Sequence, residues 1–153
     1  DSPCSAIQLV VVPGTYVVQV TEFGNDAALP GVLLQAEITP VPLLTPEAPI
    51  VTDIGEDIPV FAVLDIGAAA QVTVTADDDE GACPEAIDIG IFSSDIDGFN
   101  EVDTAFGDPD SCTSLTVLLE AGLYLVRVDG PFFGPALDAV TLSALFEAPP
   151  VEP

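Results

Sequence analysis

Short runs rich in valine, isoleucine, threonine and leucine recur along the chain between clusters of glycine, proline and aspartate. No stretch keeps a helical period of about 3.6 residues for three turns, so the pattern predicts β-strands joined by turns. The expected strands are residues 7–12, 16–21, 32–38, 60–66, 71–76, 87–92, 114–120, 123–129 and 140–146. Their spacing suits an antiparallel sandwich better than alternating βαβ units. The predicted fold class is therefore all-β, a jelly-roll-like antiparallel β-sandwich with an N-terminal β-strand arm.

A proline-rich segment interrupts this pattern between residues 39 and 49. Its sequence, TPVPLLTPEAP, contains four prolines and is typical of an extended, semi-rigid connector. It predicts an N-terminal β-arm at residues 1–40 and a main body at residues 41–153. The last residues, APPVEP, carry three further prolines, which disfavour additional sheet pairing.

The arm repeats the end of the chain. A shift of 108 residues aligns residues 4–39 with residues 112–147 without a gap, and ten of the 36 aligned pairs are identical. The identical pairs are Cys4/Cys112, Gly14/Gly122, Tyr16/Tyr124, Val18/Val126, Val20/Val128, Ala28/Ala136, Leu29/Leu137, Val32/Val140, Leu34/Leu142 and Ala36/Ala144. Chance similarity between valine-rich strands does not account for the coincident cysteine, glycine and tyrosine. The chain therefore contains an internal repeat.

Each copy is expected to form a three-stranded unit with one apolar face. A glycine, Gly14 or Gly122, permits the turn, and the strand after it alternates. The side chains expected to point inward are Tyr16, Val18 and Val20 in the first copy and Tyr124, Val126 and Val128 in the second. The first copy stands without the strands that precede the second one in the body. Because so small a unit cannot bury its apolar face alone, the arm is expected to need a partner.

Composition excludes several classes of function. The chain carries 26 aspartates and glutamates against one cation, Arg127, and has no lysine or histidine, for a formal charge of −25. Such a polyanion repels nucleic acids and anionic membrane surfaces. The missing side chains remove most bases and nucleophiles, and the sequence has no catalytic constellation, so we expect no enzymatic activity. With 49% hydrophobic residues the chain nevertheless folds rather than forming an acidic, disordered tail.

The same composition indicates where the protein works. Like charges at this density require screening by salt or bound divalent cations. No apolar run reaches the roughly 18 residues that a membrane helix needs. The sequence begins at Asp1 without a basic leader, which is typical of a processed, secreted product. We therefore expect an extracellular or cell-surface protein without membrane insertion.

The body resembles a known family in three segments: QVTVTADDDEGACPEAIDIGIFSS, AGLYLVRVDG and AVTLSALF. Together they are similar to the bacterial pre-peptidase C-terminal domain, and the resemblance covers roughly residues 50–148. The resemblance implies a small extracellular β-sandwich, non-catalytic and often appended to secreted proteases or adhesins, with calcium bound by some relatives. This chain departs from that arrangement because a half-repeat, not an enzyme, precedes the module.

Three cysteines in an expected secreted chain indicate one disulfide and one remaining thiol. Cys83 and Cys112 flank the acidic part of the body and are the predicted pair. Cys4 aligns with Cys112, but no counterpart of Cys83 precedes it. It is expected either to stay a buried thiol or to bond to another chain. Three cysteines without a CxxC spacing do not indicate a zinc site.

Two acidic segments are candidate calcium ligands. Residues 77–80 read DDDE, and residues 95–101 read DIDGFNE, with oxygen ligands at alternating positions around a glycine. Calcium takes six to eight oxygen ligands, which short aspartate-rich loops can supply. The candidate ligands are Asp77, Asp79, Asp95 and Asp97. The alternative interpretation is a solvated acidic loop.

These observations support two hypotheses of function. In the first, the protein is the structural subunit of an extracellular filament that assembles head to tail by β-strand addition, so that its partner is a second copy. Cys4, Tyr16, Val18, Val20 and Arg127 are the candidate interface residues. Arg127 lies in the outward phase of its strand and forms either a subunit contact or an ordinary surface ion pair. In the second hypothesis, the chain is a calcium-binding targeting or adhesion module of a larger secreted multi-repeat protein, with surface or matrix ligands as its partners.

Overall fold

The computed structural model describes residues 10–11, 17–19, 33–55, 59–77, 87–95, 98–107, 112–130 and 136–150. The chain divides into two units, residues 1–38 and residues 39–153. Every strand of the described residues lies in the second unit, called the body below. No helix in the described ranges is long and apolar enough to span a membrane.

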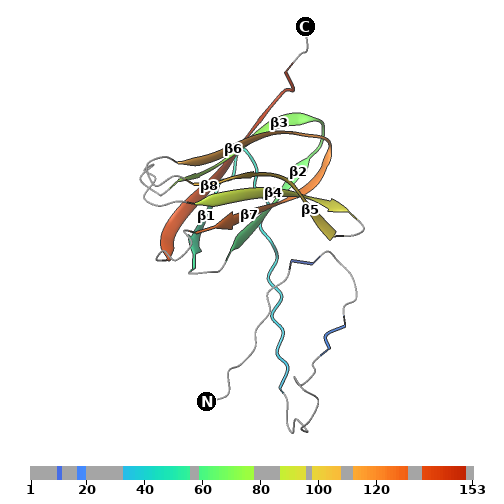
Figure 1. Cartoon of the computed structure of the whole chain (residues 1–153), viewed down its shortest axis with the longest axis vertical. Helices are drawn as coiled ribbons and strands as arrows, with labels where there is room; N and C mark the ends of the chain where they lie inside the picture. The colour runs from blue at the N-terminus through green and yellow to red at the C-terminus, as the bar shows by residue number, and fades with distance from the viewer. Residues whose placement is uncertain are drawn as a thin grey trace. The chain divides into compact units, whose positions relative to one another are not determined.

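The body is a sandwich of two four-stranded antiparallel sheets (Figure 1). The strands are β1 (Ile50–Ile54), β2 (Val60–Ile66), β3 (Ala70–Asp77), β4 (Asp88–Asp95), β5 (Gly98–Ala105), β6 (Thr113–Leu119), β7 (Gly122–Asp129) and β8 (Leu137–Glu147). The first sheet has the order β1-β8-β3-β6 and the second the order β2-β7-β4-β5. Every connection crosses between the sheets except the one from β4 to β5. This is a jelly roll, which confirms the predicted all-β antiparallel sandwich of the body.

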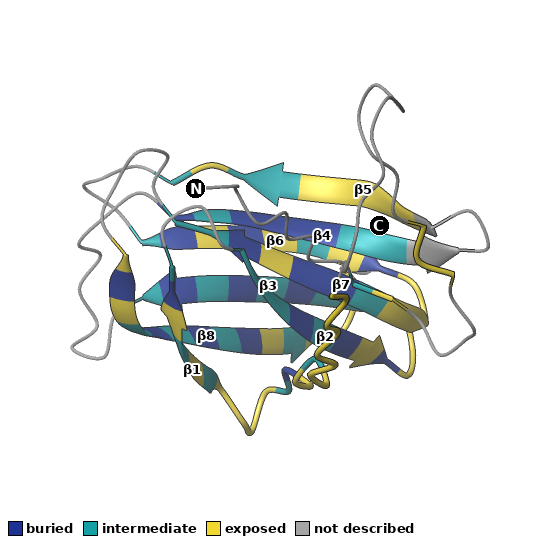
Figure 2. Cartoon of the chain, turned by 90° about the horizontal axis from the view of Figure 1, so that it is seen from below, coloured by how far each residue is buried: buried dark blue, intermediate teal, exposed yellow. Residues whose placement is uncertain are grey.

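The core lies between the two sheets because most strands alternate inward apolar side chains with less buried ones. The burial pattern of β3 shows the alternation, with Val72, Val74 and Ala76 buried between less buried neighbours. Figure 2 shows similar banding along most other strands, whereas β5 shows exposed and intermediate residues without a buried one. The largest fully buried side chains are Leu44, Ile54, Leu64, Ile89, Ile91, Leu119, Leu142, Val72, Val74, Val126 and Val128.

Six predicted strands of the body match β2, β3, β4, β6, β7 and β8 within a few residues. Two observed strands, β1 and β5, were not predicted. β5 occupies a segment expected to be a calcium loop, and it pairs with β4 as a hairpin in which Asp95 lies opposite Gly98. With Asp95 paired to Gly98, only residues 96 and 97 connect the two strands, which is the shortest common hairpin connection.

The proline-rich connector is part of the body rather than a spacer. The Leu44 amide donates to the Val63 carbonyl, and the Val63 amide donates to the Pro42 carbonyl, both at 2.8 Å. These bonds lay the connector in parallel beside β2, and Leu44 is fully buried. The prediction of an extended connector therefore missed its second role, which is to pair with the outer edge of β2 at Val63.

The substitution Gly90→Ala is expected to lower the free energy of unfolding by about 1–3 kcal/mol. A Cβ at Gly90 would lie 2.8 Å from Cε2 of Phe92, so the ring that packs over the β4 backbone would have to move. The matched control is Gly67→Ala, because a Cβ at Gly67 meets nothing within 4 Å. Chemical denaturation of both variants measures the difference, and equal destabilisation would contradict this account of Gly90.

Candidate functional site

The second copy of the repeat is distributed over both sheets. It comprises β6, β7 and β8, and none of these strands pairs with another of the three. β6 pairs with β3, β7 lies between β2 and β4, and β8 lies between β1 and β3. The expected three-stranded unit is therefore wrong as a sheet, because each of its strands takes its hydrogen-bonding partners from the rest of the body. An arm with the same sequence pattern has no such partners within itself.

Positions that are buried in the second copy are exposed in the arm. Val126 is 0% exposed, whereas the aligned Val18 is 70% exposed. Two further aligned pairs differ in the same way. Leu142 is 0% exposed and Leu34 is 60% exposed, while Leu119 is 2% exposed and Val11 is 49% exposed. Tyr16, Val20 and Cys4 lie outside the described residues, so their predicted role stays a prediction.

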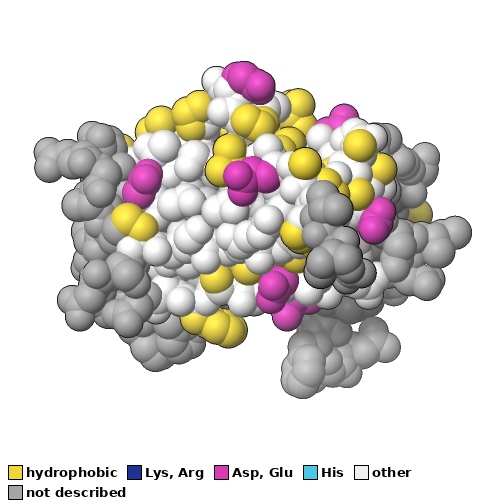
Figure 3. All heavy atoms as spheres, turned by 90° about the horizontal axis from the view of Figure 1, so that it is seen from above, with side chains coloured by type: hydrophobic (Ala, Val, Ile, Leu, Met, Phe, Trp, Pro, Cys, Tyr) yellow, Lys and Arg dark blue, Asp and Glu magenta, His cyan; other side chains and the backbone are white. Residues whose placement is uncertain are grey.

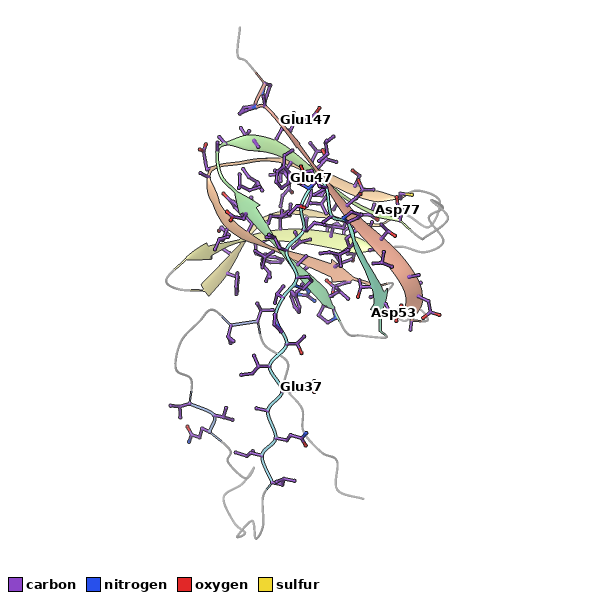
Figure 4. All side chains as sticks on the ribbon, turned by 180° about the vertical axis from the view of Figure 1, so that it is seen from behind. Glu37, Glu47, Asp53, Asp77 and Glu147 are labelled. Atoms are coloured by element: carbon purple, nitrogen blue, oxygen red, sulfur yellow. The ribbon has the colours of Figure 1, made fainter. Side chains whose placement is uncertain are left out.

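No described arm residue is in a strand, including residues 33–38, where a strand was predicted. A strand requires a hydrogen-bonded neighbour, and the apolar pattern of LLQAEI alone does not provide one. Leu33, Leu34 and Ile38 are exposed on this segment, whose acidic Glu37 is labelled in Figure 4. The arm thus presents strand-forming sequence with its apolar side chains in solvent.

In the second copy, the alternation after Gly122 points inward as predicted. Val126 and Val128 are fully buried, and Tyr124 packs against the core. The Tyr124 hydroxyl reaches back to donate to the Glu120 carbonyl at 3.1 Å, across the connection between the two sheets. This contact links β7 to the end of β6. The tyrosine therefore stabilises the connection by which the chain passes from the first sheet to the second.

The four edges of the two sheets differ in how they are protected. The outer edge of β2 carries the connector described above. β5 carries Glu101 and Asp103 and has a register shift opposite Ile91 and Phe92. β1 has only five residues and a register shift around Asp53, whose Oδ1 accepts a 3.0 Å hydrogen bond from the Ala139 amide. Charges, bulges and short length are the usual means of blocking edge pairing.

Among the described residues, none of these protections is present at the β6 edge. Its seven residues pair with β3 in continuous register and include no charged side chain. Sequence reasoning missed this edge, although a signal was available. The segment from Ser111 to Leu119 is uncharged in a chain that carries 26 acidic residues.

Hydroxyl side chains form a row on the outer face of the first sheet, beside the exposed Leu118 and Leu145. Across β3 and β6, the Thr73 and Thr116 hydroxyls are 2.9 Å apart, and those of Thr75 and Ser114 are 3.4 Å apart. Thr141 and Ser143 of β8 continue this row through their pairing with Asp77 and Thr75. Figure 3 views the molecule from the side of β3 and β6, where white, uncharged surface separates scattered acidic side chains.

The predicted calcium ligands do not form one site. Thr113, paired with Ala76 beside Asp77, donates its hydroxyl to the Ile87 carbonyl, so Asp77 lies at the end of the sandwich where β4 begins. Asp53 lies at this end too (Figure 4). Asp95 is the last residue of the eight-residue β4. At about 3.3 Å per residue, it lies roughly 23 Å from the first residue of that strand.

Asp77 and Asp95 therefore cannot ligate the same ion. Asp79 and Asp97, the ligands expected beside Asp77 and Asp95 respectively, lie outside the described residues. The geometry of neither pair is therefore described. Within the described ranges, no group of three or more potential ligands surrounds a metal position. Calcium binding by one of the two separate pairs stays a prediction.

Cys112 directly precedes β6 and is a disulfide cysteine. The sulfur bonded to it lies outside the described residues, so the Cys83–Cys112 pairing stays a prediction. Thr113, which follows Cys112, donates a hydrogen bond to the carbonyl of Ile87, and Ile87 is only four residues after Cys83 in the sequence. This placement favours Cys83 over Cys4, which belongs to the other unit.

Arg127 points outward, as its position in the strand predicts. Its Nη2 lies 2.7 Å from Oδ1 of Asp129, and the two side chains are 46% and 33% exposed. An ion pair in this setting contributes less than about 1 kcal/mol. Arg127 therefore has an acidic partner within its own strand, and its role in a subunit contact stays a prediction.

No protein-family model matches the chain, and no curated protein matches it significantly. Among solved structures, it is similar to the pre-peptidase C-terminal domain of a collagenase from Bacillus anthracis, with 16% sequence identity and a TM-score of 0.49. The match covers 69% of this chain and 91% of that domain. The fold assigned above depends on the strand order of this chain itself and not on this similarity.

Proposed function

We propose that this protein is a non-catalytic structural subunit of an extracellular filament, and that subunits assemble head to tail by β-strand addition. The observation that carries the proposal is the difference between the two copies of the repeat. Core positions of β6, β7 and β8 are solvated at the aligned positions of the arm. The arm therefore has the sequence of core strands without a core.

Association with another copy supplies what the arm lacks. Burying one valine or leucine side chain contributes about 1.5–3 kcal/mol, and the three aligned arm residues Val11, Val18 and Leu34 are all largely exposed. Strand addition also satisfies backbone amides and carbonyls. Because the arm of one copy would bind the body of the next, the contact is heterologous and propagates as a fibre instead of closing as a dimer.

The chemistry of the chain agrees with a structural role in a saline exterior. Without lysine or histidine, the chain lacks the usual bases and amine nucleophiles. A formal charge of −25 opposes binding to nucleic acids or anionic membranes. Salt outside the cell would screen this charge and allow subunits to approach each other.

Deletion of residues 1–38 is expected to abolish assembly while leaving the body folded. The cut falls at the boundary between the two units and keeps the connector residues that bond to β2. Electron microscopy and sedimentation measure assembly, and thermal unfolding measures the fold. Filaments formed by the truncated protein would refute the arm mechanism.

Point mutations test whether assembly requires the apolar side chains of the arm or only the presence of the arm. Leu34→Asp is expected to prevent assembly, since Leu34 aligns with the fully buried Leu142. Gln35→Asp adds the same charge at the next residue, which aligns with the outward Ser143, and should assemble normally. A wild-type protein that stays monomeric at all salt concentrations would instead favour the alternative, a calcium-binding targeting or adhesion module.

A further inference from the structure

We propose that the free edge of β6 is the acceptor for the uncharged N-terminal segment, residues 2–21, of a second copy of this chain. The proposal rests on the filament function above and names its contact. In it, residues 5–11 of the incoming segment become a fifth strand of the first sheet, giving the order β1-β8-β3-β6 followed by that strand of the neighbouring copy.

The state of the other three edges favours β6. The β2 edge is occupied by the connector through two backbone hydrogen bonds. The β5 edge presents Glu101 and Asp103 beside a register shift, and the β1 edge is short and irregular around Asp53. A strand added at any of these would have to displace the connector, accommodate a bulge or approach carboxylates. β6 offers seven residues in continuous register without a charge.

Charge also selects the incoming segment. Residues 2–21 lie between Asp1 and Glu22 and form the longest uncharged stretch of a chain whose formal charge is −25. Two copies of such a polyanion repel each other over most of their surfaces. Pairing an uncharged segment with an uncharged edge is the approach that brings the fewest carboxylates together.

The side-chain pattern of the segment suits the same position. By the internal repeat, residues 5–11 align with β6 itself. Ile7, Leu9 and Val11 align with Leu115, Val117 and Leu119, which face the core, while Gln8 aligns with the outward Thr116. A strand with this alternation extends the core layer and the uncharged outer layer together. It would also cover Val117, which is partly exposed at the open edge.

A charge placed at the edge tests the acceptor. Val117→Lys is expected to raise the protein concentration needed for assembly at least about tenfold, a loss of about 1.4 kcal/mol per contact, because an inward-facing lysine in an edge strand blocks strand addition. The matched control is Val102→Lys on the β5 edge, where valine is 40% exposed. That variant should assemble at the wild-type concentration. Thermal unfolding of both variants shows whether each body remains folded.

Cross-linking identifies the segment bound at the β6 edge, and it does not require that the Val117→Lys variant remains folded. A photoreactive amino acid at Thr116 of β6, in a mixture of isotopically labelled and unlabelled copies, is expected to link to residues 2–21 of another copy. The same group at the exposed Glu101 of β5 should not link to that segment. Digestion and mass spectrometry locate the linked peptides.

The outcomes separate this inference from the proposed function. Links from Glu101, or from the β1 edge, to residues 2–21 in filaments that still require the arm would overturn β6 as the acceptor and leave the filament function standing. Links between two β6 strands would indicate a closed dimer and overturn the inference. Absence of filaments from the wild-type protein would overturn both.

Discussion

Replacing Leu44 with alanine is expected to lower the free energy of unfolding by about 2–5 kcal/mol, although the residue lies in a segment whose sequence is typical of a linker. Leu44 is 0% exposed and belongs to the core cluster. Its amide bonds to Val63, so the surrounding backbone is held and cannot collapse to fill the space that the lost methyl groups leave. Urea or guanidinium denaturation of the body measures the change.

The neighbouring leucine provides the control. Leu43 lies in the same connector but is 52% exposed, and exposed substitutions usually change stability by less than about 0.5 kcal/mol. Leu43→Ala should therefore unfold near the wild-type denaturant concentration. If both variants were equally stable, the connector would act as a spacer and its pairing with β2 would contribute little to the fold.

Lowering the salt concentration from about 1 M to about 0.01 M is expected to destabilise the protein, because the screening length grows from about 3 Å to about 30 Å. At the longer distance, carboxylates across the whole body repel one another. Within the described residues, a single ion pair, between Arg127 and Asp129, offsets this repulsion. We expect Tm to fall by at least about 5 °C, which corresponds to little more than about 1 kcal/mol for a body of this size. Differential scanning calorimetry across a sodium chloride series measures it.

Calcium chloride at the same ionic strength distinguishes screening from a binding site. A bound ion raises Tm beyond the effect of ionic strength, and this gain saturates at the concentration that fills the site. Equal Tm values in the two salts would contradict the predicted calcium site and favour the interpretation of its ligands as solvated acids. A Tm independent of salt would contradict the repulsion argument itself.

Hydrophobic alternation located most of the sandwich from the sequence, because core strands show a period of two wherever one face is buried. β5 was missed because its outward acids resemble ligands, and β1 because it is short and lies between proline-rich and acidic segments. Leu44 was missed for a related reason. Prolines on both sides of it conceal a backbone that still forms two sheet hydrogen bonds.

The candidate site was only partly visible in the sequence. The repeat and the uncharged stretches can be read directly, because identity and charge are properties of the residues themselves. Pairing is not such a property. The three strands of the second copy are consecutive in the chain, yet their neighbours in space come from residues 50–95. By this pattern, the strand-forming segments of the arm are not expected to pair with one another in a small sheet.

The sequence by itself determined the all-β class, the acidic character, the internal repeat and the inward residues of the second copy, because each of these follows from local alternation or composition. Only the tertiary structure decided how the sheet edges differ, that Asp77 and Asp95 lie at opposite ends, and that no described strand pairs with the outer edge of β6. The reason is physical: edge exposure and ligand proximity depend on hydrogen bonds between segments far apart in the chain, which no local pattern encodes.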